Sequence, residues 1–498
     1  MSHDLHRLLT KSDIHPPVDS EGRVVSSLAY DSRKVEKDAL FFALPGEKSD
    51  GSDFARQAAE QGATGVVAAT DIADLSIPVA RVPDARAAMA DVAKTYYDDP
   101  AASLKAIAIT GTNGKTTTAF LVKHIADSVL HRCGLIGTVR TVVGDREFDS
   151  VRTTPESPDV QSLLREMVDV GSRAVTMEVS SHALVQHRTR GIDWDAAIFT
   201  NLTQDHLDYH KTMEAYFDAK ASLFEGVYVQ TAKRGKSVIN TDDRYGRFLV
   251  ERLPKNAKPL TYGLGVHPAF RASNVRFDFA GTQFQLTARD REYLVRTPLI
   301  GMFNVYNSLA ALTAAAAVGI EIRRAIAALA TVPQIPGRLE RVPAKRNFQV
   351  FVDYAHTDDA LTNVLRTLRD LRPRRLVVVF GCGGDRDRAK RPLMGRAAAQ
   401  IADYSIVTSD NPRSEDPERI LADIVTGMRE GTHETVVDRA DAITRAINLA
   451  EQGDIILIAG KGHETYQEFE NGRRVNFDDV STARNAIAAK PTVTDEDR

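Results

Sequence analysis

Residues 105–127, KAIAITGTNGKTTTAFLVKHIAD, decide the fold class of this chain. The apolar run at 105–109 predicts a buried β-strand, and the pattern that begins at Lys115 predicts an α-helix. Further strand-like runs alternate with helical patterns along the chain, among them RAVTMEV, AAIFTNL, KSVIN, RRLVVVFG, YSIVTSD and DIILIAGKG. This alternation is typical of an α/β protein with mostly parallel sheets.

A short glycine-bearing loop joins that strand to that helix. Gly111 and Gly114 let backbone N–H groups turn towards an anion, Lys115 adds a positive charge, and Thr116 offers a hydroxyl to a magnesium ion. In the standard phosphate-binding loop the first glycine would fall at Ile109, so this loop is shorter. The alternative is a tight strand–helix turn that binds nothing, but a Lys-Thr pair opening the helix favours a nucleotide-phosphate site.

The composition excludes several classes of protein. The 498 residues include 64 Lys+Arg and 67 Asp+Glu, and the net charge of −3 argues against a protein held on nucleic acid by charge alone. No stretch approaches the roughly 18 apolar residues of a membrane span, and the first residues lack an apolar signal core. With two cysteines, a disulfide framework and a cysteine-built metal site are ruled out. We therefore expect a cytoplasmic, multidomain enzyme.

Two polar, proline-bearing stretches predict domain boundaries. YYDDPAAS at 96–103 is the first and TVPQIPGRLE at 331–340 is the second. The predicted domains are a smaller N-terminal α/β domain at 1–100, a central domain with the glycine-bearing loop at 101–336, and a C-terminal α/β domain at 337–498. Each apolar strand of the last domain ends in a polar loop, which is where open α/β sheets bind ligands.

The end of the central domain carries two further predicted elements. Between about 274 and 297 the pattern alternates, as in VRFDFAGTQFQL, and a turn at 280–281 predicts an antiparallel hairpin insert. A helix is predicted from near Asn304 through the alanines to Val318. Asn304 and Asn307 would share one face of this helix, where simple helix capping is the alternative to ligand binding.

Carboxylates and imidazoles at strand ends are candidate metal ligands. Glu178 ends the strand-like run RAVTMEV, where an acid is costly to bury unless it is paired or metal-bound. An Arg- or Lys-paired structural carboxylate is its alternative role. The stretch NLTQDHLDYH offers Asp205, His206, Asp208 and His210. Such groups suit magnesium beside ATP phosphates, although we expect His210 at the surface.

A series of motifs resembles those of the Mur ligase family, in order and spacing, from about residue 28 to 480. They are TGTNGKT, EVSSHALVQHR, TNLTQDHLDYH, the helix around Lys220, FNVYNSLAA, PGRLE, VDYAHTDDAL, GCGGDRDRAKRPLMG, DNPRSEDP and AGKGHETYQ. The resemblance is closest to the branch that adds meso-diaminopimelate. It implies a three-domain fold, with a P-loop-type ATP-binding central domain and a Rossmann-like C-terminal domain. It also implies an ATP- and Mg²⁺-dependent ligase of peptidoglycan synthesis, acting on UDP-N-acetylmuramoyl-L-Ala-D-Glu and meso-diaminopimelate. Neither nucleic acid nor membrane is an expected partner, and we expect a monomer.

The resemblance also implies roles for residues of the nucleotide and metal sites. Nucleotide contacts would come from Gly111, Thr112, Asn113, Gly114, Lys115, Thr116, Thr117, Asn304, Asn307, Arg338, Asp353 and His356. Metal ligation would come from Thr116, Glu178, His206 and Lys220, with Lys115, Glu178, His206 and Lys220 as catalytic residues. Lys220 would carry a carbamate, which turns a cation into an anionic oxygen ligand for a divalent metal. Without the family, a lone helix lysine is usually solvated.

Substrate contacts are implied in the same way. The residues for the UDP-linked dipeptide would be Ser32, Thr153, Thr154, Ser180, Gln186 and Arg188. Relatives often have Asn before the paired threonines, whereas this chain has Arg152, which puts the contacts of that Asn in doubt. The residues for the incoming amino acid would be Arg386, Asp410, Asn411, Pro412, Arg413, Gly460 and Glu464.

Arg413 distinguishes the amino acids that this pocket would accept. Diaminopimelate and lysine both end in an amine, but only diaminopimelate has a second carboxylate there. Arginine grips a carboxylate with two parallel hydrogen bonds, so Arg413 fits that task, while Glu464 would receive an ammonium. The alternative for Arg413 is a salt bridge to Glu415 or Asp416 within its own loop.

Other functions remain as alternatives. A lysine-adding sister ligase and a folylpolyglutamate synthetase share TGTNGKT-like loops, but DNPR and EVSSHALVQHR argue against both. A nucleotide-gated switch would hydrolyse ATP without an amine acceptor. A nucleic-acid-binding ATPase would need a basic stripe, which this sequence lacks.

Overall fold

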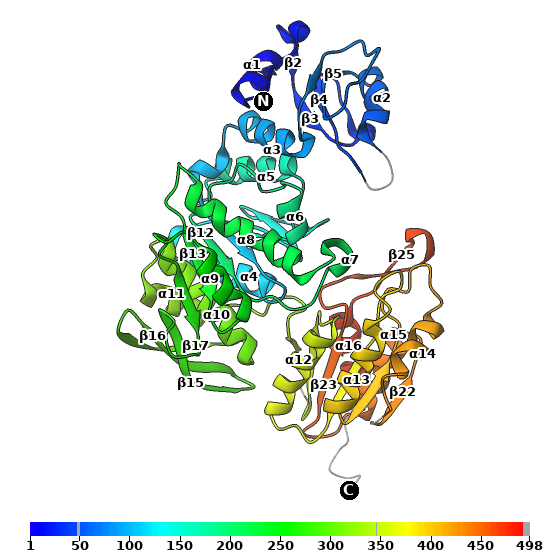
Figure 1. Cartoon of the computed structure of the whole chain (residues 1–498). Coiled ribbons are helices and arrows are strands. Elements are labelled where there is room, and N and C mark those ends of the chain that lie inside the picture. Colours follow the sequence, from blue (N-terminus) through cyan, green and yellow to red (C-terminus); the bar gives the residue numbers. More distant parts are fainter. Residues whose placement is uncertain (47–49, 345, 430, 492–498) are drawn as a thin grey trace. The chain divides into compact units, whose positions relative to one another are not determined.

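A computed structural model describes residues 1–46, 50–344, 346–429 and 431–491 (Figure 1). The chain forms two compact units. The first comprises Met1–Ala272, Thr287–Arg291 and Tyr306–Leu329, and the second comprises Ser273–Leu286, Glu292–Val305 and Ala330–Arg498. Across the described residues, no helix combines the length and the apolar character that a bilayer crossing requires.

The first unit begins with a small parallel sheet. Its strands, in spatial order, are β3 (Ser27–Ala29), β4 (Ala39–Ala43), β5 (Ala63–Ala68) and β6 (Val79–Arg81). Its helices are α1 (Leu5–Lys11), α2 (Ala55–Glu60) and α3 (Ala85–Tyr96). Every residue of β4 is buried, as expected for a parallel strand covered on both faces. The predicted N-terminal α/β fold is therefore present.

The large sheet has the strand order β10-β9-β8-β11-β7-β12-β13-β14-β15-β16-β17. Its parallel strands are β7 (Lys105–Thr110), β8 (Cys133–Ile136), β11 (Ala174–Glu178), β12 (Ala196–Phe199), β13 (Lys236–Asn240) and β14 (Leu260–Gly263). The edge strands β9 (Arg140–Val143) and β10 (Arg146–Asp149) run antiparallel. Since parallel strands share one carboxyl edge, the loops after β7, β11 and β12 meet there.

The helices that join these strands follow the predicted α/β alternation. They are α4 (Lys115–Leu130), α5 (Ser157–Asp169), α6 (Ser181–Val185), α7 (Leu207–His210), α8 (Met213–Val229), α9 (Arg244–Arg252), α10 (Met302–Ala317) and α11 (Ile322–Leu329). The core beside α5 and α8 contains Trp194, Phe199 and Phe224. The strand–loop–helix prediction at 105–127 is confirmed.

The predicted insert is a three-stranded meander rather than a single hairpin. Its strands are β15 (Phe270–Asp278), β16 (Gly281–Ala288) and β17 (Arg291–Thr297), which are neighbours in the sheet. Alternate residues of β16 are buried, Phe284 and Leu286 among them. The predicted turn at 280–281 is confirmed, and the helix predicted from near Asn304 begins two residues earlier, at Met302.

The second unit contains a six-stranded sheet of order β18-β19-β23-β20-β21-β22. The strands are β18 (Glu340–Val342), β19 (Gln349–Asp353), β20 (Leu376–Phe380), β21 (Tyr404–Val407), β22 (His433–Thr435) and β23 (Ile455–Ala459). Only β18 is antiparallel to its neighbour. The helices are α12 (Asp358–Asp370), α13 (Lys390–Ile401), α14 (Pro417–Val425), α15 (Arg439–Leu449) and α16 (Asp479–Ala489) (Figure 1).

Helices cover both faces of this second sheet. Val378 of β20 packs in a core with α12, α13 and α14, whereas its neighbours Val377 and Val379 pack in another core with α15 and α16. The sheet is therefore doubly wound, which confirms the predicted Rossmann-like architecture. Each predicted domain holds one of the three sheets described above, while the boundaries at 100 and 336 stay predictions.

Candidate active site

Close packing against the loop after β7 makes its two glycines necessary. Gly111 has a φ of 146°, and a Cβ there would lie 1.9 Å from the Thr200 Oγ1. Gly114 has a φ of 83°, and a Cβ there would lie 2.5 Å from the Asn307 Oδ1. Positive φ and close approach both favour glycine. Asn307 of α10 therefore lies against the loop that the sequence predicts to bind phosphate.

Residues after β12 hold the loop in shape, and sequence analysis did not single them out. The Asn201 backbone carbonyl accepts from the Thr112 N–H at 2.9 Å, and its Oδ1 accepts from the Asn113 N–H at 2.9 Å. The Thr200 hydroxyl donates to the Asn113 carbonyl at 2.6 Å. The loop is thus organised by the protein itself, as phosphate binding through backbone N–H groups requires. The sequence feature that could have identified Thr200 and Asn201 is their position directly after a buried strand.

Lys115 opens α4 and folds back over the loop. Its Nζ donates to the Gly111 carbonyl at 2.8 Å and to the Thr112 carbonyl at 2.7 Å. Thr116 and Thr117 are buried in the same first turn. The helix N-terminus adds a partial positive charge to that of the ammonium. Glycine loop, lysine and helix terminus therefore converge on one point, as predicted.

Glu178, at the end of β11, is fully buried and held by neutral donors. Its Oε2 accepts from the hydroxyls of Thr116 at 2.9 Å and Thr138 at 3.0 Å, and its Oε1 accepts from the Thr138 N–H at 2.8 Å. Among the described residues Glu178 forms no ion pair, so the Arg- or Lys-paired alternative is wrong. A buried carboxylate beside a hydroxyl fits a hard divalent cation.

Lys220 of α8 is almost completely buried beside the same loop. Its Nζ donates to the Gly111 carbonyl at 3.1 Å and lies 4.6 Å from the centre of the Tyr216 ring. Burial, together with the charge of Lys115, lowers the pKa of Lys220 well below its usual value. The general expectation of a solvated helix lysine is therefore wrong here. A neutral amine is the form that reacts with carbon dioxide.

The histidines of NLTQDHLDYH differ in position. His206 is half-exposed, lies 3.4 Å from Asp205, and has a pKa lowered by burial and by Lys115 and Lys220. The expectation that His210 lies at the surface is wrong. His210 is buried, its Nε2 lies 2.8 Å from the Ser181 Oγ, and burial lowers its pKa to about 4. The helical turn of α7 (Leu207–His210) rotates it inwards.

The described residues contain no cluster of three or more His, Cys, Asp or Glu side chains that could enclose a metal. Magnesium does not need one, because it is usually held by one or two carboxylates, several waters and substrate phosphates. The Thr116 hydroxyl and the Glu178 carboxylate provide such a partial set. The donors present therefore fit magnesium, with His206 as a further candidate.

Predicted contacts to the UDP-linked substrate gather beside β11. The Thr154 hydroxyl donates to the Glu178 carbonyl at 2.8 Å and accepts from the Ser180 N–H at 3.1 Å. Arg188 donates to the Thr154 carbonyl at 2.9 Å and to the Gln186 Oε1 at 2.6 Å. The Thr153 hydroxyl lies 3.1 Å from that of Thr138. Ser32 instead contacts Gln57 at 3.3 Å, next to the small N-terminal sheet.

Three arginines surround one buried carboxylate, Glu156, in this region. Arg152 reaches it at 2.6 Å, Arg188 at 3.1 Å and Arg86 at 3.5 Å. Glu156 was not singled out in the sequence. One carboxylate cannot neutralise three guanidinium groups, so the cluster keeps excess positive charge. Arg152 thereby takes part in a site suited to an anion.

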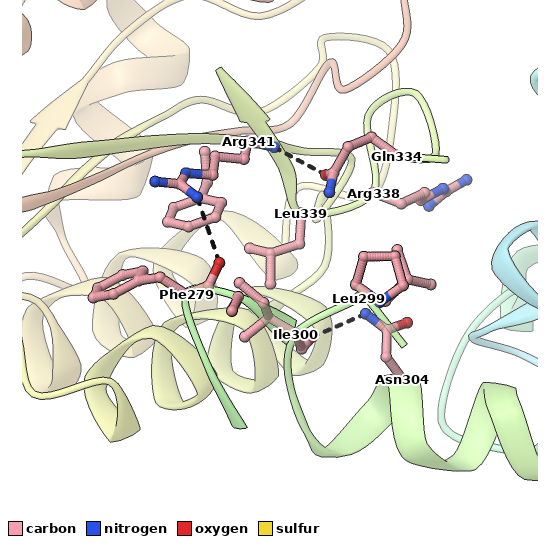
Figure 2. A pocket seen from close by; sticks show the side chains of 11 residues that line it. Phe279, Leu299, Ile300, Asn304, Gln334, Arg338, Leu339 and Arg341 are labelled. Carbon is pink, nitrogen blue, oxygen red and sulfur yellow. Dashed lines mark hydrogen bonds between the residues drawn. The ribbon is translucent and has the colours of Figure 1, made fainter. Parts of the chain in front are cut away.

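A cavity of about 250 Å³ in the second unit brings together two predicted nucleotide contacts, Asn304 and Arg338 (Figure 2). Asn304 donates to the Ile300 carbonyl at 2.9 Å, and the Arg338 guanidinium lies 4.8 Å from the centre of the Tyr354 ring. Phe279 and Leu339 provide apolar walls. This mixture of apolar walls and a few polar groups is typical of a ligand pocket.

Asp353 and His356 follow β19 near that cavity. Asp353 is buried, and its carboxylate accepts from the backbone N–H groups of Leu339 at 2.6 Å and Ala355 at 2.8 Å. Burial raises its pKa, and the charge of Arg338 opposes that shift. His356 is exposed, and its Nδ1 lies 2.8 Å from the Tyr354 carbonyl. These hydrogen bonds of Asp353 shape the chain beside Arg338.

The predicted amino-acid residues come together at the carboxyl ends of β20, β21 and β23. Asn411 donates to the Glu464 Oε2 at 2.9 Å. A Cβ on Gly460, whose φ is 118°, would lie 2.6 Å from the Asp410 Oδ2. A Cβ on Gly383 would lie 3.0 Å from Arg413 Nη1 and 3.9 Å from the Arg386 Cγ. Separate loops therefore form one polar cluster, at the edge where such sheets bind ligands.

Arg413 does not form the salt bridge within its own loop. Its Nη1 donates to the Gly384 carbonyl at 2.8 Å, and its Nε lies 3.4 Å from Glu468. Glu415 pairs instead with Arg391, whose hydrogen bond lowers the pKa of Glu415 to about 2. Arg413 has a φ of 52°, which is strained for a residue with a side chain. Its Nη2 bonds to no other described residue, so one end of the guanidinium is available.

Comparison with known proteins supports the assignment of the fold. Three family models match the chain: the Mur ligase family, catalytic domain, at 24–97, the Mur ligase middle domain at 109–315, and the Mur ligase, glutamate ligase domain, at 337–462. A relative from Geobacillus thermodenitrificans (strain NG80-2), a UDP-N-acetylmuramoyl-L-alanyl-D-glutamate--2,6-diaminopimelate ligase, is 46% identical over 467 residues, covering 93% of this chain and 95% of its own.

Two further proteins carry the same description. The relative from Bacillus cereus (strain ATCC 14579) is 42% identical over 489 residues, covering 98% of this chain and 99% of its own. A solved structure of a UDP-N-acetylmuramoyl-L-alanyl-D-glutamate--2,6-diaminopimelate ligase is 36% identical, with a TM-score of 0.72, and covers 98% of this chain and 99% of its own. These matches show that the chain belongs to the Mur ligase family and is an ATP-dependent amide ligase.

Proposed function

We propose that this ligase adds meso-2,6-diaminopimelate to the γ-carboxylate of D-glutamate in UDP-N-acetylmuramoyl-L-alanyl-D-glutamate, a cytoplasmic step of peptidoglycan synthesis. The relatives that match most of the chain are described with this reaction. Arg413 carries the choice of amino acid, since it presents one end of its guanidinium in a cluster that also contains Glu464. We propose residues 1–100 for the UDP moiety, 101–336 for ATP and 337–498 for the amino acid, in a monomer.

The proposed reaction has two steps. The substrate carboxylate attacks the γ-phosphate of ATP, which releases ADP and gives an acyl phosphate. The amine of diaminopimelate then attacks the acyl carbon, and phosphate leaves from a tetrahedral intermediate. Catalysis of this kind depends on positioning and on charge neutralisation. Lys115 and the backbone N–H groups from Gly111 to Thr117 would neutralise phosphate charge, while Asn304, Asn307, Arg338, Asp353 and His356 would form the remaining nucleotide contacts.

Two further groups would act beside the phosphates. Thr116 and Glu178 would hold one magnesium ion and His206 a second, and bound magnesium would reduce the repulsion between two anionic reactants. Lys220 would supply an additional anionic oxygen as its carbamate. Its burial and lowered pKa support this role, because both favour the neutral amine, which is the form that reacts with carbon dioxide.

The substrate contacts follow from the two polar clusters. Thr153, Thr154, Ser180, Gln186 and Arg188 would line the path of the dipeptide, with Ser32 near the uridine. At the other end, Arg413 would bind the distal carboxylate of diaminopimelate and Glu464 its ammonium, helped by Arg386, the segment 410–412 and Gly460. A lysine substrate would leave the available end of the Arg413 guanidinium without a carboxylate, which disfavours lysine.

Phosphate release with each candidate amino acid tests the proposed function. With ATP and the UDP-linked dipeptide present, meso-diaminopimelate should drive phosphate release and amide formation, whereas lysine and a folate acceptor should give little of either. ATP turnover without any amine would instead indicate a nucleotide-gated switch. Equal rates with lysine would contradict the assignment of Arg413.

Arg152 provides a prediction specific to this chain. Replacing it with Asn, the residue often found in relatives, should raise KM for the UDP-linked dipeptide about three- to tenfold, because one charge-assisted partner is lost from a half-exposed site. Steady-state kinetics would measure the change. Arg146→Asn is the control, since Arg146 is an exposed arginine ion-paired with Glu166 outside the cluster. An unchanged KM in Arg152→Asn would limit Arg152 to its ion pair with Glu156.

A further inference from the structure

We propose that Lys461 is a positioning residue of the amino-acid pocket. Its ammonium orients Asn411 and Glu464, and through Asn411 it also orients the pair of Glu468 and Arg413. The inference rests on the proposed function, because it concerns the pocket assigned there to diaminopimelate. Gly460 and Glu464, on either side of Lys461, are predicted pocket residues from the sequence, whereas Lys461 is not.

Lys461 lies in the loop after β23 and is completely buried. A buried ammonium is costly unless it is paired and hydrogen-bonded. Its Nζ donates to the Asn411 Oδ1 at 2.9 Å and to the Glu464 Oε2 at 3.0 Å, and it lies 5.6 Å from the centre of the Tyr466 ring. Both hydrogen-bond partners, Asn411 and Glu464, belong to the predicted pocket. The contacts that stabilise this buried ammonium are therefore contacts to pocket residues.

The ammonium is one of two donors that fix the orientation of the Asn411 amide, the other being the Glu468 backbone N–H. Because an ammonium only donates, the atom of Asn411 that faces Lys461 must be the oxygen. The Nδ2 of Asn411 is then directed to Glu464, where it donates to Oε2 at 2.9 Å. Oε2 of Glu464 thus accepts two hydrogen bonds, while Oε1 bonds to no other described residue. Glu464 is held with one oxygen available for a ligand ammonium.

The same amide connects Lys461 to Arg413. The Asn411 Oδ1 also accepts from the Glu468 backbone N–H at 3.0 Å. The Glu468 carbonyl accepts from the Arg413 N–H at 3.0 Å, and its carboxylate lies 3.4 Å from the Arg413 Nε. One buried lysine is therefore linked to both groups proposed to grip diaminopimelate, at its ammonium and at its carboxylate. Loss of Lys461 should loosen both.

Lys461→Met tests this inference, because methionine keeps the length of the side chain and removes the charge. KM for meso-diaminopimelate should rise about tenfold or more, as when one partner of a buried charge pair is truncated. KM for ATP and for the UDP-linked dipeptide should stay within about twofold, and the preference for diaminopimelate over lysine should fall. Unchanged amino-acid KM and preference would overturn the inference.

Lys490→Met is the control for the loss of a hydrogen-bonded lysine elsewhere in the same unit, at a partly exposed position. The Lys490 Nζ donates to the carbonyls of Ile447 at 2.9 Å, Asn448 at 2.7 Å and Ala450 at 2.8 Å, so it is bonded as fully as Lys461 but outside the pocket. This variant should lower the melting temperature and leave the amino-acid KM unchanged. A rise in that KM equal to the rise in Lys461→Met would reduce Lys461 to a general structural role.

Two further variants keep the inference testable if Lys461→Met does not fold. Lys461→Gln retains a donor for Asn411 and should give a smaller rise in KM. In the double variant Lys461→Gln with Glu464→Gln, the rise in KM should be less than the product of the two single effects, because both changes weaken the same contact. A fully multiplicative rise would overturn the inference. If the wild-type protein forms no amide with any diamino acid, the proposed function is wrong. If the wild type forms the amide but the Lys461 variants keep its amino-acid KM and preference, only the inference about Lys461 is wrong.

Discussion

Lys115→Ala should abolish amide formation, with a loss of about a thousandfold or more in kcat, as when a charge that stabilises a transferring phosphoryl group is removed. The Lys115 ammonium lies on the loop that presents backbone N–H groups to phosphate, at 2.8 Å from the Gly111 carbonyl. Binding of the UDP-linked dipeptide should remain near normal, because its proposed contacts lie beside β11. Phosphate release, product mass and calorimetric titration would measure the three quantities.

Lys123→Ala is the control for that experiment. Lys123 lies on the same helix, α4, and pairs with Asp127 at 2.5 Å, away from the loop. It should retain wild-type kinetics, since helical ion pairs of this kind contribute only about 0.3–0.5 kcal/mol. Loss of folding in Lys115→Ala, or activity close to that of the wild type, would contradict the phosphate role of Lys115.

Arg413→Ala should weaken the use of meso-diaminopimelate by about 1.5–3 kcal/mol, the usual contribution of hydrogen bonds to charged groups. The effect should appear in kcat/KM for diaminopimelate and be small for lysine, which lacks the distal carboxylate. Competition between the two amino acids, with product masses resolved, would measure the change in preference. The expected outcome is a ligase that discriminates poorly and not an inactive protein.

Arg388→Ala separates this effect from a general loss of positive charge. Arg388 is exposed and pairs with Glu415 at 2.8 Å, and Glu415 keeps its second partner, Arg391, in the variant. Amino-acid preference should therefore be unchanged. If Arg413→Ala had the kinetics of Arg388→Ala, the distal carboxylate would have to be recognised by another group.

Short sequence patterns predicted the residues of the phosphate loop because these residues are contiguous in the chain. The strand, glycine loop and helix at 105–127 are contiguous, and backbone geometry at Gly111 and Gly114 follows from residue type. The carboxyl-edge placement of Glu178 followed from its position at the end of an apolar run. The DNPR segment was found by family resemblance, and the polar loops after the strands of a doubly wound sheet agree with its placement.

Contacts between distant segments could not be predicted in this way. Asn201 accepts a hydrogen bond from the glycine-bearing loop, 88 residues earlier in the chain. Glu468 pairs with Arg413 although the two residues belong to separate loops. His210 was expected at the surface because a polar stretch gives no periodicity from which to infer an inward turn. Lys461 was missed because a lysine between glycines has the same local pattern whether it is solvated or buried.

The sequence by itself determined the α/β class, the phosphate loop, the family and the residue types that carry the chemistry, since each depends on short-range geometry or on motif order. Only the tertiary structure decided which of these groups are buried and what they bond. Lys220 and Lys461 show the reason. The state of an ammonium depends on desolvation and on partners supplied by other segments, and both arise only once the sheets have packed.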